Sequence, residues 1–427
     1  MFMNGDGIPL DSTSGAEALS EPGSLPSPPM ATPSIHPALP EVIEQLAPLE
    51  RRPGSSGEAE AAAWIAQRLR DAGCDAEVED AEFHDGYAKP IGALAAVTTL
   101  AGVVSLRERT RLAGGLAALI AGAAIADDVA NTRRVFRRLT KPLPTQNVVA
   151  IAGDLDADRT LVVMAHHDAA ATGVIFDDRF QAWLAHQFPG LVERLDTSFP
   201  LWWLVLAGPA AVAFGAARRR RSLIALGTAI AAVTTAAMAD IATSATVPGA
   251  NDNLTAVAVL VALAERLRDE PIHGLRVMLV SCGAEEVIQG GINSFAERHF
   301  PTLPRDRTWF LNLDTVGSPI LAMCEGEGPV IMEDYFDRRF RDLIARVADR
   351  SGAPLRRGMR ARNSTDAVIP SHARYPTATL VSINRHKALS NYHLPSDTPD
   401  NVDYRTVAQA LHVTEAVARE LATNPWI

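Results

Sequence analysis

The chain has 427 residues, of which 47% are hydrophobic and 21% are charged, so it can build one large domain or two ordinary ones and is not globally disordered. Its formal net charge of -10 argues against a nucleic-acid partner, because a nucleic-acid surface requires a basic face on the protein. Three cysteines, Cys74, Cys282 and Cys324, are too few for a disulfide framework.

The amino terminus is rich in Pro, Ser and Gly up to residue 39. It has neither the basic start nor the apolar stretch of a signal peptide. We therefore predict a disordered tail at 1–39, with no signal peptide, followed by one domain that occupies residues 40–427.

Short apolar segments alternate with amphipathic ones along this domain. Strands are predicted at 74–83, 147–154, 161–168, 274–283, 309–317 and 378–384. Helices are predicted at 40–49, 55–73, 253–270, 335–352 and 402–424, with Ser55 or Ser56 capping the second of them. This alternation predicts an α/β fold in which a mostly parallel, mixed sheet is sandwiched between helices.

Two apolar insertions, at 87–144 and 172–247, interrupt the alternation. Each contains two apolar stretches of ~15–20 residues joined by a basic turn, which is the outline of a helical hairpin. The stretches are rich in Ala and Gly and apolar on all sides, so we favour association with a membrane over burial inside the protein. If both hairpins leave the domain on the same side, they form a four-helix bundle.

The orientation of these hairpins in a membrane stays open. Four arginines at 218–221 would place the hairpin tips in the cytoplasm under the positive-inside rule. The basic run at 131–141, at the other end of the first hairpin, would place the opposite end there. We read the arginine turn as a topology or lipid-headgroup feature, not as a nucleic-acid patch.

Five short strings rich in His, Asp and Glu follow predicted strands or precede helices. They are AHHDAA (165–170), PGANDNLTAVA (248–258), SCGAEEVIQGG (281–291), LNLDTVG (311–317) and NYHLPSDTPDN (391–401). In an open sheet, loops beyond the carboxyl ends of parallel strands meet in one crevice. Side chains from all five strings are therefore expected to converge on one pocket.

The residue types in these strings predict a metal centre. Zinc binds imidazole nitrogen and carboxylate oxygen, and a pair of metal ions shares a bridging carboxylate. The expected ligands are His166, Asp252, Glu286, Asp314 and His393. Glu285 points away from its neighbour Glu286 and is available as a general base. Asp168 is placed to orient the His166 ring.

The order of these motifs resembles the zinc-dependent aminopeptidases of the M28 type, whose relatives include glutamate carboxypeptidase, glutaminyl cyclases and the transferrin-receptor ectodomain. The motifs that carry the resemblance are His166–Asp168, Asp252–Asn253, Glu285–Glu286, Asn312–Asp314, Tyr392–His393 and Asp397–Thr398, within 40–86, 145–170 and 248–425. The resemblance implies two zinc ions bridged by Asp252, the first held by His166 and Asp314 and the second by Glu286 and His393. It also places Asp366 near the substrate, although Ala367 stands where the family has a histidine.

The expected activity is hydrolysis of amino-terminal residues from peptides. A glutaminyl cyclase on the same fold remains an alternative, and so does a membrane-anchored binding protein without catalysis. A carboxypeptidase would require basic side chains for the substrate carboxylate, for which Arg356, Arg357, Arg360 and Arg362 are candidates. We expect no metal role for His167, His372 or His386, and a packing role for Cys282.

Overall fold

The computed structural model describes residues 34–84, 86–177, 179, 183, 186–188, 190, 197–198 and 200–424. Residues 1–33 of the predicted tail lie outside this description, and the first helix begins at Ala38, just inside the predicted tail. Residues 32–427 form one compact unit, and the elements below all belong to it.

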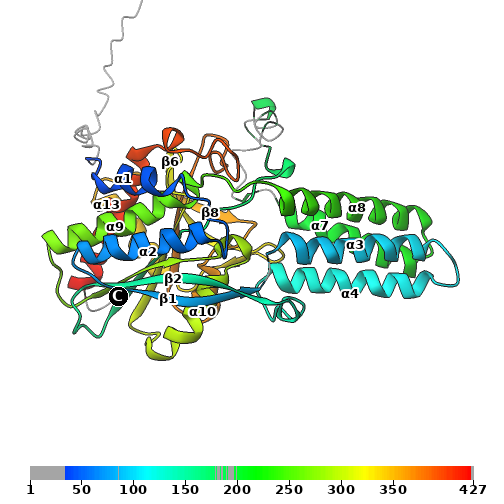
Figure 1. Cartoon of the computed structure of the whole chain (residues 1–427), viewed down its shortest axis with the longest axis horizontal. Coiled ribbons are helices and arrows are strands. Elements are labelled where there is room, and N and C mark those ends of the chain that lie inside the picture. The colour runs from blue at the N-terminus through cyan, green and yellow to red at the C-terminus, as the bar shows by residue number, and fades with distance from the viewer. Residues whose placement is uncertain are drawn as a thin grey trace, which may run out of the picture. The chain divides into compact units, whose positions relative to one another are not determined.

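Among the described residues, nine strands form one mixed sheet (Figure 1). Their order across the sheet is β1-β2-β4-β3-β5-β9-β6-β7, with β8 paired to β6. The strands are β1 (Asp75–His84), β2 (Pro142–Gly153), β3 (Thr160–His166), β4 (Arg276–Cys282), β5 (Thr308–Asp314), β6 (Ile320–Glu327), β7 (Glu333–Asp334), β8 (Arg356–Ala361) and β9 (Thr377–Ile383). The four central strands β4, β3, β5 and β9 run parallel, whereas β1, β2 and β7 pair antiparallel with their neighbours. The predicted mixed α/β sheet is confirmed, with its main parallel part at the centre.

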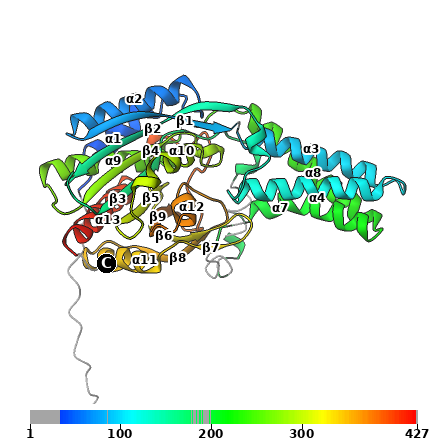
Figure 2. The ribbon, with the colours of Figure 1, turned by 90° about the horizontal axis from the view of Figure 1, so that it is seen from below.

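Helices cover both faces of the sheet (Figure 2). One face carries α1 (Ala38–Leu46), α2 (Ser56–Asp71), α9 (Thr255–Asp269), α11 (Arg338–Arg350) and α13 (Tyr404–Thr423), and the other carries α10 (Gly290–His299) and α12 (Val368–His372). Strand β3 is continuously apolar in sequence because both of its faces are buried. Leu161 and Val163 pack into the first layer, while Val162 and Met164 pack into the second.

Four helices of the two insertions form a bundle at one end of the sheet (Figures 1 and 2). They are α3 (Ala88–Ser105), α4 (Arg111–Val129), α7 (Leu201–Ala217) and α8 (Arg221–Thr243). The chain enters and leaves each insertion at neighbouring points, so the two segments that flank an insertion run antiparallel to each other. This pairing joins β1 to β2 around the first hairpin, and Ala171 to Thr246 around the second. In the part of the second insertion that precedes α7, residues 178, 180–182, 184–185, 189, 191–196 and 199 lie outside the described residues.

The bundle packs small residues inside and carries large apolar residues outside. A Cβ atom on Gly227 would lie 2.6 Å from the carbonyl oxygen of Gly208, so α7 and α8 approach closely there. By contrast, Leu100, Leu116 and Val233 are 67%, 58% and 70% exposed. Helices α3, α4 and α8 are long and apolar enough to cross a membrane, and α7 is a shorter apolar helix.

Several elements were not predicted from the sequence: β6, β7, β8, α10 and α12. Strand β6 contains Glu325, Gly326 and Glu327, which weaken the apolar pattern of a buried strand. Helix α10 begins with Gly290 and Gly291, which are poor helix formers.

Candidate metal centre

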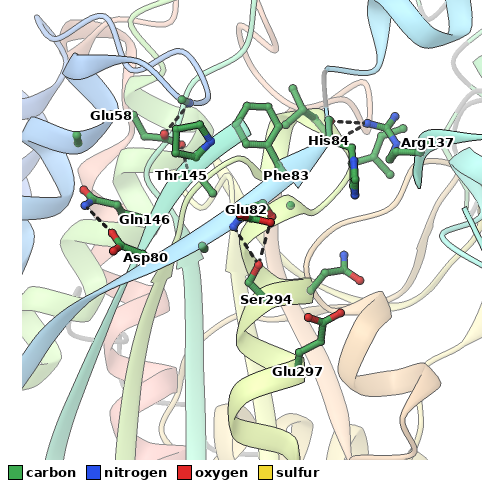
Figure 3. Close-up of a pocket in the computed structure, with 18 of the residues that line it drawn as sticks. Glu58, Asp80, Glu82, Phe83, His84, Arg137, Thr145, Gln146, Ser294 and Glu297 are labelled. Carbon is green, nitrogen blue, oxygen red and sulfur yellow. Dashed lines mark hydrogen bonds between the residues drawn. The ribbon is translucent and has the colours of Figure 1, made fainter. Parts of the chain in front are cut away.

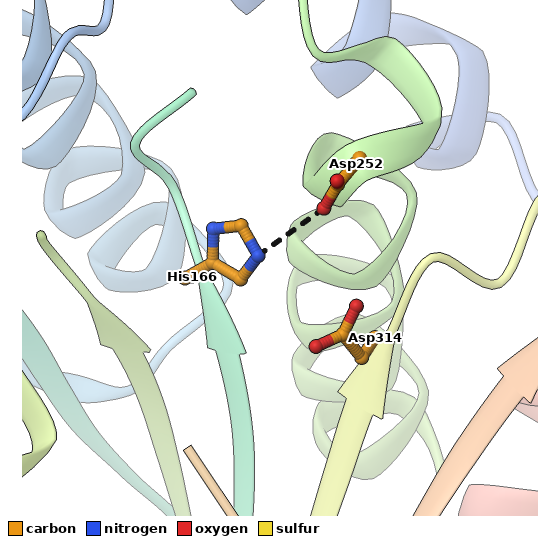
Figure 4. Close-up of side chains that lie close together, drawn as sticks. All are labelled: His166, Asp252 and Asp314. Atoms are coloured by element: carbon orange, nitrogen blue, oxygen red, sulfur yellow. Dashed lines mark ion pairs between the residues drawn. The ribbon is translucent and has the colours of Figure 1, made fainter. Parts of the chain in front are cut away.

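The five predicted ligands converge beyond the carboxyl ends of the central strands. His166 is the last residue of β3 and Asp314 the last of β5, while Glu286 lies in a short 3-10 turn that follows β4. Asp252 precedes α9, and His393 comes from the loop after β9. Figure 4 shows His166, Asp252 and Asp314 around one space. Side chains from five segments therefore meet at one edge of the sheet.

Asp252 lies between the two histidines. Its Oδ1 is 3.4 Å from Nε2 of His166, and its Oδ2 is 3.4 Å from Nε2 of His393. The His393 Nε2 is also 3.1 Å from Oε2 of Glu286. Three groups of mutually close ligand atoms result: His166–Asp252–Asp314, Asp252–Glu286–His393 and His166–Glu285–Glu286. The first two share Asp252 and are the two groups that the sequence resemblance implies.

The donor set fits two divalent metal ions. It offers two imidazoles and three carboxylates, which are ordinary zinc ligands. Nε2 of His393 and Oε1 of Glu286 are buried and have no hydrogen-bond partner among the described residues. Buried polar atoms without a partner are costly, and coordination would satisfy such atoms. The centre therefore has the composition and the unsatisfied atoms of a metal site.

Electrostatics indicate that the centre requires added positive charge. Burial alone would raise the pKa of Asp252, but pairing with His166 and His393 holds it below its usual range. Burial opposes a charged ring at His393, yet Glu286 and Asp252 raise its pKa to about 10. Burial, with Asp252 nearby, raises the pKa of Asp314 to about 6. The imidazoles hold protons here because carboxylates outnumber them, and metal cations would replace those protons.

Asp168 contacts both the imidazole and the loop that carries the glutamates. Its Oδ1 lies 3.4 Å from Nδ1 of His166, as the sequence predicts for an orienting carboxylate. The same carboxylate accepts the backbone N–H groups of Glu285 and Glu286, each at 3.0 Å. Asp168 therefore fixes the position of the Glu285–Glu286 turn as well, a role that the sequence did not indicate.

Two residues from the recognised motifs hold the Asp252 loop. Asn253 donates from Nδ2 to the carbonyl of Leu313 at 3.0 Å and accepts the N–H of Thr315 at 2.9 Å. It thereby clamps the loop to the end of β5. Asp397 accepts the N–H groups of Asn251 and Asp252 at 2.8 and 3.1 Å.

Arg51 is a supporting residue that sequence reasoning missed. Its side chain is fully buried and donates to the carbonyls of His167, Leu46, Pro248 and Gly249, at 2.6–3.2 Å. It joins the His166 loop to the segment before Asp252. Arg51 lies within 40–86, a range that the family resemblance covers, but nothing in the sequence shows that the guanidinium reaches these carbonyls.

Gln289 was also missed. It follows the glutamate pair and donates from Nε2 to Oε1 of Glu285 at 3.1 Å and to the carbonyl of Ser364 at 2.9 Å. Its own Oε1 accepts a hydrogen bond of 2.8 Å from Nδ2 of Asn131, which follows α4. The predicted base is therefore held by a side chain that is itself held from the bundle.

The remaining predicted residues occupy distinct positions. Asp366 is buried, and burial raises its pKa to about 7. Nδ1 of His167 lies 3.0 Å from Oγ of Ser281, and burial lowers the pKa of this ring to about 4, as suits a structural residue. Cys282 is fully buried in the packed layer under α10. His372 lies 3.3 Å from Glu333, outside the ligand groups.

Three of the four arginines proposed for a carboxypeptidase have other partners. Arg357 pairs with Glu325 and Asp342, each at 2.9 Å. Arg360 pairs with Asp334 at 2.8 Å. Arg362 lies over the ring of Trp203, 5.0 Å from its centroid. None of the partners of these three arginines is a predicted metal ligand.

A separate cavity of about 960 Å³ lies between α2, β1 and α10 (Figure 3). None of the five predicted ligands lines it. Its walls combine the acidic Glu58 and Glu297 with the basic Arg137, which is paired with Asp128. This mixture does not indicate one class of ligand.

Comparisons with known proteins agree with this geometry. Residues 233–418 match the model of peptidase family M28. The matched range contains four of the five predicted ligands and Glu285, while His166 precedes it. A sequence comparison with curated proteins gives no match. The family match confirms the resemblance drawn from the motifs.

Solved structures share the fold. An aminopeptidase from Aneurinibacillus sp. strain AM-1 is 16% identical with a TM-score of 0.51, over 90% of this chain and 93% of that one. A zinc aminopeptidase from Bacillus subtilis is 14% identical with a TM-score of 0.53, over 90% and 94%. A glutaminyl cyclase from Tannerella forsythia is 14% identical with a TM-score of 0.54, over 91% and 99%. At these identities the likeness establishes the fold.

Proposed function

We propose that this chain, whose residues 233–418 match the model of peptidase family M28, is a membrane-bound metallo-exopeptidase that removes amino-terminal residues from peptides. The observation that carries the proposal is the position of Asp252, which is shared by two ligand groups that each contain one histidine. That arrangement fits a pair of zinc ions bridged by one carboxylate.

The chemistry divides between the metal ions and the protein. Bound at these ligands, two divalent ions would lower the pKa of a water molecule and polarise the peptide carbonyl. Glu285 is buried beside the centre, 3.9 Å from Nε2 of His166, and accepts the proton of the attacking water. It then donates that proton to the leaving amine. Gln289 and Asp168 hold the turn that carries Glu285 in place.

Cleavage from the amino terminus is favoured over cleavage from the carboxyl terminus. A carboxypeptidase would use a basic side chain to bind the terminal carboxylate of its substrate. Arg357 and Arg360 instead pair with acidic residues of the protein.

The bundle supports the membrane part of the proposal. Its interior contains glycines at close helix contacts, while large apolar side chains face outward. In water this arrangement would expose apolar surface, whereas in lipid it is the usual packing of membrane helices. Helix α3, with 18 residues, is about 27 Å long, close to the thickness of a bilayer core.

A glutaminyl cyclase is the second candidate, because solved cyclases share this fold. Both activities would use the same glutamate as base. The two ligand groups around Asp252 favour the exopeptidase, because they fit a pair of metal ions. A peptide with amino-terminal glutamine separates the two reactions by its products.

The test is metal content and activity of the full chain in lipid or detergent. We expect about two zinc ions per chain, release of amino-terminal residues from a peptide panel, and loss of activity on chelation. Glu285→Gln should lower kcat by roughly 10³-fold while metal content stays the same. Exposed Glu60→Gln on α2 is the matched control and should leave kcat unchanged.

Each part of the proposal has its own contrary result. Ammonia release and a cyclised product without hydrolysis would establish the cyclase. Folded protein that binds no zinc would reject the metal centre. Release of the protein from membranes by an alkaline carbonate wash would reject insertion of the bundle.

A further inference from the structure

The metal centre lies beside the base of the helical bundle. The second hairpin is inserted between two ligands: it leaves the chain shortly after His166 and returns shortly before Asp252. The two segments that form its stem pair through the N–H of Thr172 and the carbonyl of Ala245, at 3.0 Å. The first hairpin reaches the Glu285 turn through Asn131 and Gln289. Both hairpins are thus anchored to the same site.

A residue of the second insertion lies directly on a predicted ligand. The ring of Phe176 meets the ring of His393 edge to face, with centroids 4.4 Å apart. The turn that carries Phe176 is held to the bundle, because the N–H of Val174 donates to Oδ2 of Asp240 in α8 at 2.7 Å. The wall of the metal centre is therefore continuous with the bundle.

One apolar cluster joins the base of the bundle to the loops that surround the metal centre. It contains residues of α3, α4 and α8 together with Ile288, and Phe176, Trp202 and Val330 pack against it. Ile288 follows the glutamate pair by two positions, so the cluster extends to the catalytic turn.

The residues at this edge of the metal centre, which we call the rim, are of the types that membrane proteins place at the lipid–water interface. The rings of Tyr87 and Trp202 contact each other, with centroids 6.2 Å apart. Trp203 is 50% exposed, and its Nε1 donates to the carbonyl of Val330 at 3.2 Å. Val174 and Ile331 are each 71% exposed. Trp and Tyr are enriched at headgroup level in membrane proteins, where their rings contact lipid and their polar atoms contact water.

We propose that the substrates are peptides anchored in the same bilayer, whose free amino terminus emerges at the headgroup level and enters the metal centre across the rim formed by Val174, Trp203 and Ile331. This rests on the proposed exopeptidase function and on insertion of the bundle. The rim contacts the apolar residues of the emerging peptide. Anchoring in one membrane also raises the effective concentration of such a peptide at the site.

Spacer length provides the sharpest test. The full, zinc-loaded protein is reconstituted in phospholipid vesicles with peptides that have one amino-terminal reporter residue, a polar spacer and a carboxyl-terminal acyl anchor. A site at headgroup level should cleave peptides with spacers of about 5 residues as well as those with about 20. A site well above the membrane would cleave only the long ones, because each residue spans at most about 3.5 Å. The same peptides without the acyl chain should be cleaved with kcat/KM lower by about 10²-fold.

Substitutions in the rim test whether it causes the preference for anchored over soluble peptides. The double substitution Val174→Ser and Ile331→Ser should lower the ratio of kcat/KM between anchored and soluble peptides several-fold. The control is Leu155→Ser, which removes an apolar side chain that is 62% exposed, in the turn between β2 and β3 at the opposite end of the sheet. This substitution should leave the ratio of kcat/KM between anchored and soluble peptides unchanged.

The outcomes separate this inference from the proposed function. Equal kcat/KM for anchored and soluble peptides, or cleavage of long spacers alone, overturns the anchored-substrate proposal and leaves the exopeptidase intact. Failure to cleave any peptide by zinc-loaded, folded protein overturns the exopeptidase, and the substrate proposal fails with it.

Discussion

Asn131, two residues beyond the end of α4, donates a hydrogen bond of 2.8 Å to Gln289, and both side chains are buried. Gln289 in turn donates to Glu285, the proposed base. A base that must accept a proton in a defined direction depends on such positioning. The bundle and the catalytic turn are thus linked by two successive hydrogen bonds.

We expect Gln289→Leu to lower kcat by roughly 10-fold, because the Glu285 carboxylate loses its fixed partner. KM and zinc content should change little, since Gln289 is not among the predicted metal ligands. Steady-state kinetics with metal analysis measure this split, and Gln67→Leu on the exposed side of α2 is the control. Unchanged kcat in the folded, metal-loaded variant would show that Gln289 does not position the base.

Arg51→Met should destabilise the fold and weaken metal binding together. The substitution leaves buried carbonyls without a donor, at a cost of about 3 kcal/mol in the free energy of unfolding. It also frees the His166 loop from the segment before Asp252, so zinc affinity should fall by roughly 10-fold or more. Thermal unfolding and zinc titration test both effects. Arg52→Met, at the half-buried neighbouring position, should change neither as much.

Glu327 should make stability dependent on pH. It is buried, and burial raises its pKa to about 8, although Thr365 donates to it. Between pH ~4.5 and ~8 the folded chain keeps a proton that the unfolded chain releases. Stability from this group therefore falls as pH rises through that window, by at most about 1.4 kcal/mol per pH unit.

Glu327→Gln removes this titration. Relative to wild type, the variant should gain stability between pH 5 and pH 8, measured as the difference in unfolding free energy at the two values. Exposed Glu60→Gln should show no such difference. A parallel pH dependence of wild type and Glu327→Gln would mean that Glu327 is ionised in the folded protein across this range.

Gly227→Leu should disrupt the bundle, because a side chain at this position meets the backbone of α7 around Gly208. We expect a loss of about 1–3 kcal/mol or more, from overpacking at a close helix contact. Leu226→Ala, at the adjacent outward position, is the control, since Leu226 is 54% exposed. Thermal unfolding in detergent measures both. Equal tolerance of the two changes would argue against close packing of α7 and α8.

Much of the site could be predicted because its ligands belong to compact local motifs. Asp252 stands in an Asp-Asn turn before a helix, and Glu286 in a glutamate pair after a strand. These types, in this order along an alternating α/β chain, indicate a metal centre without any knowledge of contacts. The two hairpins could also be predicted, because long apolar stretches separated by arginine turns are visible in composition alone.

The supporting contacts could not be predicted in this way. The hydrogen bond from Asn131 to Gln289 joins residues 158 positions apart, and neither has a local pattern that distinguishes it from an ordinary polar residue. A mixed sheet was predicted, but which of its strands run antiparallel could not be, for a related reason. Strands β1 and β2 pair across the first hairpin, and strand direction depends on how an insertion returns, which hydrophobic periodicity does not record.

The sequence by itself determined the fold class, the set of candidate ligands and the presence of apolar hairpins, because each follows from residue type and short-range spacing. The tertiary structure decided that Asp252 is shared by the two ligand groups, and that both hairpins meet at the rim of the metal centre. It also decided that Arg357 and Arg360 are occupied by acidic partners. Such relationships depend on the packing of segments far apart in the chain, and no local pattern encodes which buried polar groups will satisfy one another.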